Sequence, residues 1–231
     1  MENKIKYAKY AGIVYLLIAI IAPIAMMYIP SQLISNSSIT ETIKNIMGNQ
    51  LLFSLGIGIE TIVCLLEIVL SVILYTLFKE INATLSTIAL VSRLSMTIIQ
   101  AINALASLTV IGILTSSAMN GTDVNSVIFA LLKYKELGVM IWQIFFGLHL
   151  IILGYLVYKS NYVARFFGIL LSIASLGYLA DSYFTIFQLN ATVFSTIGSF
   201  LLVISTLGEV AITFRFLLKK INLPNLKQKV K

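Results

Sequence analysis

Ionisable and polar side chains lie inside the long apolar stretches of this 231-residue sequence. Carboxyl groups and an imidazole within a membrane can exchange protons or bind ions. A charge at the centre of a membrane helix costs about 2.5–3.5 kcal/mol, so such groups should face one another rather than lipid. The candidate functional cluster comprises Glu60, Glu67, Arg93, Gln100, Asn103, His149, Asp181 and Glu209.

Helical spacing places several of these residues on shared stripes. Glu60 and Glu67, in the run GIGIETIVCLLEIVLS, lie seven residues apart, which is about two turns of a helix. Arg93, Gln100 and Asn103 form a polar stripe in a second apolar stretch. We therefore expect these stripes to line a common interior.

Depth within the membrane then predicts two pairs. Arg93 should pair with Glu209 or Glu67 in an inner cluster. Glu60 and Asp181 are expected to form a second, outer pair of acids. Each pairing would make the burial of its members tolerable.

The same residues also allow structural interpretations. An arginine paired with an acid often fixes helix register, and a single histidine is more typical of a hydrogen-bonded bundle residue than of a metal ligand. Gln100 and Asn103 suit hydrogen bonds between helices. The chain has one histidine, His149, and one cysteine, Cys64, which excludes a structural zinc cluster of several Cys or His ligands. No metal, cofactor or catalytic residue is assigned.

Composition determines the class of protein. The chain is 59% hydrophobic and 11% charged, with a mean hydropathy of +0.98. Soluble domains carry about 25% charged residues, so this chain requires lipid as its solvent. We predict an all-α polytopic integral membrane protein, a bundle of six transmembrane helices in a single domain over 1–231. The spans are expected near 10–29, 51–78, 84–114, 137–158, 165–188 and 193–218.

The connections predict shorter elements. Within 31–50, Ser38 and Glu41 form a capping box for a helix that could lie on the membrane surface. Residues 123–135 could form a second surface helix that runs into the fourth span. In the first span, a kink is expected at Pro23.

The basic residues predict the orientation. Assigning alternate connections to opposite sides puts most of the 16 basic residues on the side of both termini, leaving Lys44, Lys133 and Lys135 on the other. The positive-inside rule then places both termini, including a basic tail at 219–231, in the cytoplasm. The net charge of +7 is thereby explained by topology and contact with lipid headgroups, and no nucleic-acid partner is expected.

Several runs resemble a known family. They are YAGIVYLL, FFGLHLIILGYLVYKSNYVARFFGILL, GYLAD and LGEVAITFRFLL. Together with the acids of the second span, they resemble the prokaryotic membrane family called domain of unknown function 4386, over about residues 7–220. The run ARFFG departs from the PRxLG expected of the family at that turn. The resemblance implies a six-helix protein of a bacterial or archaeal cell membrane, and it implies no activity. Its polar positions match Glu60, Glu67, Arg93, His149, Asp181 and Glu209.

Three functions remain open from the sequence. The preferred one is transport of a small solute or ion through the bundle or through a homo-oligomer. This transport could be coupled to protons. The alternative is a non-catalytic sensor, stress or assembly protein in which the buried charges are structural. A membrane-embedded metal-dependent enzyme is the least supported, because no H-E-x-x-H or G-x-S-x-G motif is present. Whether the protein is an enzyme stays open, with the balance against it.

Overall fold

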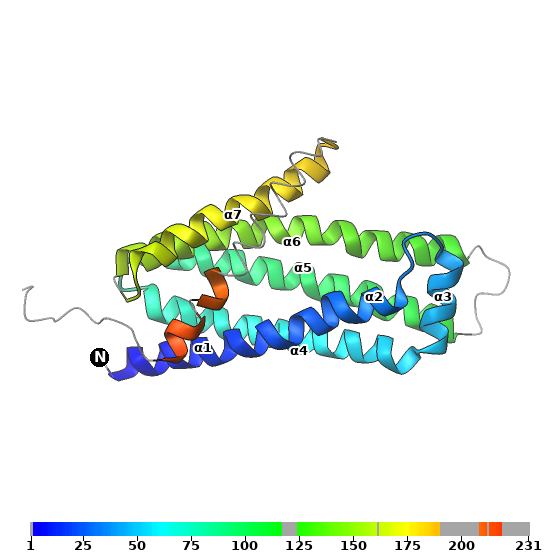
Figure 1. The fold of residues 1–231 in the computed structure, drawn as a ribbon, viewed down its shortest axis with the longest axis horizontal. Helices are drawn as coiled ribbons and strands as arrows, with labels where there is room; N and C mark the ends of the chain where they lie inside the picture. Colours follow the sequence, from blue (N-terminus) through cyan, green and yellow to red (C-terminus); the bar gives the residue numbers. More distant parts are fainter. Residues whose placement is uncertain (1, 117–123, 161, 190–207, 212, 219–231) are drawn as a thin grey trace, which may run out of the picture.

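The computed structural model describes residues 2–116, 124–160, 162–189, 208–211 and 213–218, and its labelled elements are all helical. Figure 1 shows long helices running side by side, with α3 across one end of the bundle. Among these described residues, five helices are long and apolar enough to cross a membrane. The elements are α1 (Glu2–Pro23), η1 (Ile24–Tyr28), α2 (Ile29–Leu33), α3 (Ile39–Gly48), α4 (Gln50–Phe78), α5 (Ala83–Thr115), α6 (Val124–Ser160) and α7 (Arg165–Ile186).

The first span is longer than expected and changes its winding near the predicted kink. Helix runs from α1 through η1 into α2, and Asn3–Leu33 qualifies as one span. Immediately after Pro23, the helix adopts π-type winding over Ile24–Tyr28, closed by a hydrogen bond from the Ile29 N–H to the Ile24 carbonyl. Pro23 lacks an N–H, so it interrupts regular α-helical bonding at this point.

Helix α3 packs across the end of the bundle. One half of the expected capping box is present, because the Ser38 hydroxyl accepts a hydrogen bond from the Glu41 N–H at 3.2 Å. The Glu41 carboxylate accepts from the Ser35 hydroxyl at 2.6 Å. Ile46 is fully buried in an apolar cluster that includes Ile29 and Phe53, and Ile43 packs against the same cluster. The apolar face of α3 therefore covers helix ends, whereas the sequence suggested contact with the membrane surface.

Residues 124–135 run into the fourth span, as expected, with no break that would make them a separate surface helix. They are the first turns of α6, an unbroken helix of 37 residues. No Gly or Pro interrupts this stretch, and Ile128 is fully buried against the end of the bundle. Tertiary packing thus extends the fourth span well before its expected start at 137.

The predicted sixth span falls largely outside the described residues, as does the basic tail at 219–231. Within 193–218, residues 208–211 and 213–217 are helical. This short helix meets α1 closely, because a Cβ on Gly12 would lie 2.8 Å from the Leu217 backbone nitrogen.

Helix α7 lies against the outside of α6, and among the labelled elements it contacts no other (Figure 1). Small residues permit the approach: a Cβ on Gly154 would lie 2.6 Å from the Gly168 carbonyl oxygen. Farther along the pair, Ser182 donates a hydrogen bond to the Gln143 side-chain oxygen at 2.8 Å. The interior of the bundle is therefore formed mainly by α1, α4, α5 and α6.

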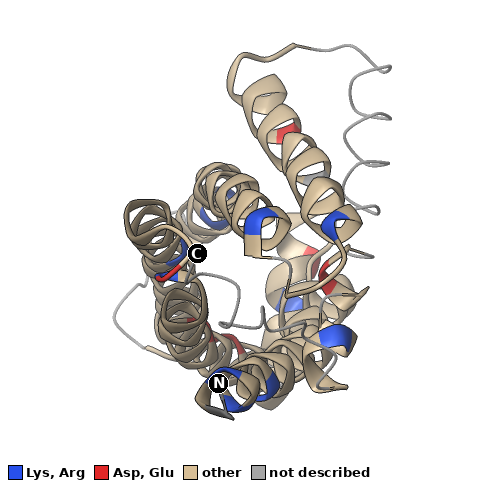
Figure 2. Ribbon diagram, turned by 90° about the vertical axis from the view of Figure 1, so that its left-hand side faces the viewer, with Lys and Arg blue, Asp and Glu red and all other residues tan. Residues whose placement is uncertain are grey.

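Charged residues also lie at the end of the bundle that carries the N-terminus. Figure 2 looks along the bundle from the end that carries the N-terminus, where Lys and Arg colour several of the nearest helix ends. At this end, Lys4 of α1 donates hydrogen bonds to Glu80 in the α4–α5 connection and to Tyr162 in the α6–α7 connection. The Lys4 ammonium also holds the pKa of Glu80 below its usual value of 4.5.

Candidate functional site

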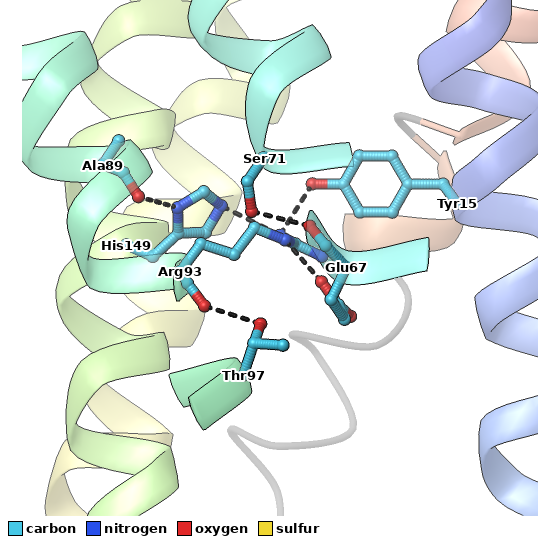
Figure 3. Close-up of polar contacts among 7 residues, drawn as sticks. All are labelled: Tyr15, Glu67, Ser71, Ala89, Arg93, Thr97 and His149. Atoms are coloured by element: carbon cyan, nitrogen blue, oxygen red, sulfur yellow. Dashed lines mark hydrogen bonds and ion pairs between the residues drawn. The ribbon is translucent and has the colours of Figure 1, made fainter. Parts of the chain in front are cut away.

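Arg93 lies at the centre of a sealed polar cluster between α1, α4, α5 and α6 (Figure 3). Its Nε donates to Glu67 Oε2 at 2.6 Å, and the two side chains are only 2% and 6% exposed. Its Nη1 donates to the Tyr15 hydroxyl at 3.3 Å. The pair that Arg93 forms is therefore with Glu67, one of the two acids expected from the sequence.

His149 completes this cluster from α6, and its contacts determine its tautomer. Its Nε2 lies 2.9 Å from Arg93 Nη1, and its Nδ1 lies 2.8 Å from the Ala89 carbonyl oxygen. Arginine is only a donor and a carbonyl is only an acceptor, so Nε2 accepts and Nδ1 carries the proton. In this arrangement His149 is neutral, and a second proton would point at the guanidinium.

Two aromatic rings lie beside the guanidinium. The Arg93 Cζ lies 5.2 Å from the centre of the Tyr15 ring and 5.7 Å from that of Phe146. Hydroxyls at the margin bond to backbone: Ser71 donates to the Glu67 carbonyl and Thr97 to the Arg93 carbonyl. The adjacent void, bounded in part by His149, measures only about 10 Å³. The Arg93 cluster, defined here as Tyr15, Glu67, Arg93, Phe146 and His149, is thus closely packed.

A second buried ion pair joins α4 to α6 nearer the α3 end of the bundle. Lys135 Nζ donates to Glu60 Oε2 at 2.6 Å and to the Ser107 hydroxyl at 2.9 Å. The Glu60 side chain is 2% exposed and that of Lys135 is 23% exposed. This pair replaces the expected pairing of Glu60 with Asp181.

The Glu60–Lys135 pair borders a cavity of about 920 Å³. Its walls come from η1, α2, the 34–38 loop, α3, α4, α5 and α6. Apolar side chains such as Ile29, Phe53 and Phe129 line it alongside serine hydroxyls of the loop. The lining also contains Lys133 and Glu136, which form an exposed ion pair of 2.7 Å. The cavity has the size and mixed lining of a small-molecule site.

Three other predicted residues, Gln100, Asn103 and Glu209, belong to neither of these two sites. Gln100 is buried and directs its amide toward Met26 Sδ, 3.7 Å away. Asn103 is buried and packs over Gly138 of α6. Glu209 is half-buried and acts electrostatically on Arg93 and Tyr15.

Asp181 is half-buried on α7, and it makes no hydrogen bond or ion pair to any residue that the structure describes. Helix α7 packs on α6 without reaching α4, so Asp181 and Glu60 are not brought together.

Comparison with known proteins identifies the family. The family model described as "Domain of unknown function (DUF4386)" matches residues 10–219. The chain belongs to this family. A protein of Archaeoglobus fulgidus, described as "Uncharacterized protein", is 58% identical over 38 residues, which are 16% of this chain and 24% of that protein. The match thus spans about a quarter of the relative's length. No solved structure matches the chain.

In this DUF4386 chain, sequence reasoning missed three partners of the predicted residues. From the sequence, Tyr15 is part of an apolar span, Lys135 falls in an expected connection, and Ser107 has no predicted role. Lys135 lies 14 residues before His149, so both fall on nearly the same face of one continuous helix. That spacing was a usable signal, but only if 124–160 is treated as one helix. Tyr15 carried no comparable signal.

No group of three His, Cys, Asp or Glu side chains able to hold a metal ion occurs among the described residues.

Proposed function

We propose that this chain is a multi-pass protein of the cell membrane, with both termini cytoplasmic, that binds and transports a small solute or ion. The observation that carries the proposal is the cavity of about 920 Å³ bordered by the buried Glu60–Lys135 pair. Ionisable groups inside a membrane protein commonly mark solute and ion pathways. With the proposed orientation, the cavity opens toward the outer side.

The Arg93 cluster would form the barrier beyond the cavity. Glu60 and Glu67 lie on the same stripe of α4, so a solute or proton leaving the cavity along this stripe next meets Glu67. There the bond between Arg93 and Glu67 ties α5 to α4. Transport would require this bond to open or to exchange partners, because the void beside the cluster is too small for a solute.

Flux into proteoliposomes tests the proposal. The panel comprises amino acids, polyols, inorganic cations and protons, and the variants are Glu60→Gln and Glu67→Gln, with Lys44→Met as the control. We expect flux of at least one panel member, and a loss of about tenfold or more in both glutamate variants, because each loses a charge-assisted hydrogen bond. Lys44→Met should retain flux, since Lys44 is exposed on α3 and is not among the residues that line the cavity. Equal flux in the wild type and Glu67→Gln would remove the role proposed for that acid.

A second function is favoured by the close packing of the Arg93 cluster. The guanidinium has an acid, a hydroxyl, an imidazole and two aromatic faces as partners, which also suits a purely structural register lock. The protein would then be a non-catalytic sensor or assembly protein, alone or as a homo-oligomer. In that case, the wild-type protein should give no flux for any member of the panel.

A further inference from the structure

We propose that the cavity binds a zwitterion: a molecule carrying a primary ammonium and an anionic group a few bonds apart, attached to a compact apolar part. This inference rests on the proposed function, because it names the class of solute for the same cavity. A free amino acid with an aliphatic side chain is the simplest such molecule.

Both members of the buried ion pair retain bonding capacity toward the cavity. A lysine ammonium has three donors, and Lys135 uses two of them, on Glu60 and Ser107. A carboxylate has two acceptor oxygens, and among the described residues only Oε2 of Glu60 has a partner. Glu60 and Lys135 both line the cavity. A carboxylate or phosphate can therefore bind Lys135 while an ammonium binds the second oxygen of Glu60.

Charge balance selects a zwitterion over an ion of either sign. Among the residues that the structure describes, four charged side chains line the cavity, and they form two internally neutral pairs, Glu60–Lys135 and Lys133–Glu136. A ligand with a net charge would add an uncompensated charge beside Glu60, whose side chain is 2% exposed. Such a charge is costly to bury, whereas a zwitterion leaves the site neutral and bonded at both ends.

The rest of the lining suits the remainder of such a ligand. Phe53, Ile57 and Phe129 contribute apolar surface, and the cavity volume falls within the range for sites of small molecules. Transfer of aliphatic groups from water to such a surface stabilises binding. A purely polar polyol would leave both this surface and the two charged groups without matching partners.

Calorimetric titration of the full-length protein in phosphatidylglycerol nanodiscs tests the inference. The probes share one carbon skeleton: leucine, 4-methylpentanoate without the ammonium, and 3-methylbutylamine without the carboxylate. We expect leucine to bind at least about tenfold more tightly than either singly charged analogue, the effect of one lost charge-assisted hydrogen bond. Equal binding of leucine and an analogue would overturn the inference.

The double variant Glu60→Gln/Lys135→Met tests recognition by the ion pair in a protein that should still fold. It removes both charges together, so it leaves no unpaired charge in the site. We expect it to lose leucine binding while unfolding at nearly the wild-type temperature. Lys44→Met should bind leucine as the wild type does, because Lys44 is exposed on α3 and is not among the residues that line the cavity. Unchanged binding in the folded double variant would refute recognition by the ion pair.

Two further measurements distinguish a free amino acid from a lipid headgroup, and the zwitterion inference from the proposed function. A phosphatidylethanolamine headgroup has the same chemistry as a free amino acid, and competition by this lipid would identify it as the occupant. Binding of glycerol or an inorganic cation without leucine or that lipid would overturn the zwitterion and leave the proposed function intact. Absence of binding by every probe would count against both.

Discussion

The two buried ion pairs of this protein share the same helices and differ in what surrounds them. Arg93 and Glu67 are enclosed by Tyr15, Phe146 and His149, with a void of about 10 Å³ beside them. Glu60 and Lys135 instead border a cavity of about 920 Å³. A buried charge can thus be tolerated by complete enclosure or at the wall of an open site. Only the second arrangement leaves space for a ligand beside the ion pair.

Removing one cation from each pair should give the largest difference between the two sites. Arg93→Met leaves Glu67 buried and unpaired, and we expect a loss of about 3–5 kcal/mol in the free energy of unfolding. Lys135→Met should cost about 1–3 kcal/mol, because Glu60 faces a cavity that admits water. Chemical unfolding in detergent micelles measures both changes. Equal costs would break the distinction between a sealed and an open site.

A substitution between the two sites should have an intermediate effect. Gly138 of α6 lies against Asn103 of α5, and an added Cβ would collide with the Asn103 side-chain oxygen. We expect Gly138→Ala to cost about 1–3 kcal/mol of stability through overpacking. Gly112→Ala on α5 is the matched control, since no atom lies within 4 Å of its added Cβ, and it should be neutral or slightly stabilising. Stability changes of similar sign in both variants would contradict the packing described.

The smallest effect is expected at the exposed end of the bundle. The stability contribution of its ion pair is the reference for the two buried pairs. Lys4 lowers the pKa of Glu80 below 4.5, so this ion pair stabilises the fold above pH 4.5, and the contribution is lost as the pH falls below that value. Glu80→Gln should cost less than about 1 kcal/mol at pH 7, because the Glu80 side chain is 62% exposed. Thermal unfolding at pH 7 and pH 3 checks this, and the difference between wild type and variant should shrink at pH 3. A cost independent of pH would exclude the ion pair as its cause.

The stripes visible in the sequence predicted part of the candidate site. Glu67 and Arg93 occupy the interior faces of α4 and α5, and a charged group within an apolar span must find a partner there. The partner of Glu60 could not be predicted in the same way. Its partner, Lys135, lies 75 residues away on a part of α6 that resembled a connection, and only the docking of that segment brings the two charges together.

Composition and periodicity by themselves determined that this chain is helical and apolar enough to span a membrane several times, because backbone groups in lipid must be satisfied within each segment. They also determined which residues face inward on α4 and α5. Tertiary structure decided which charges meet, that α7 packs only on α6 among the labelled elements, and that a cavity lies beneath α3. Those features depend on how helices distant in sequence pack against one another, and the spacing within any single helix does not encode them.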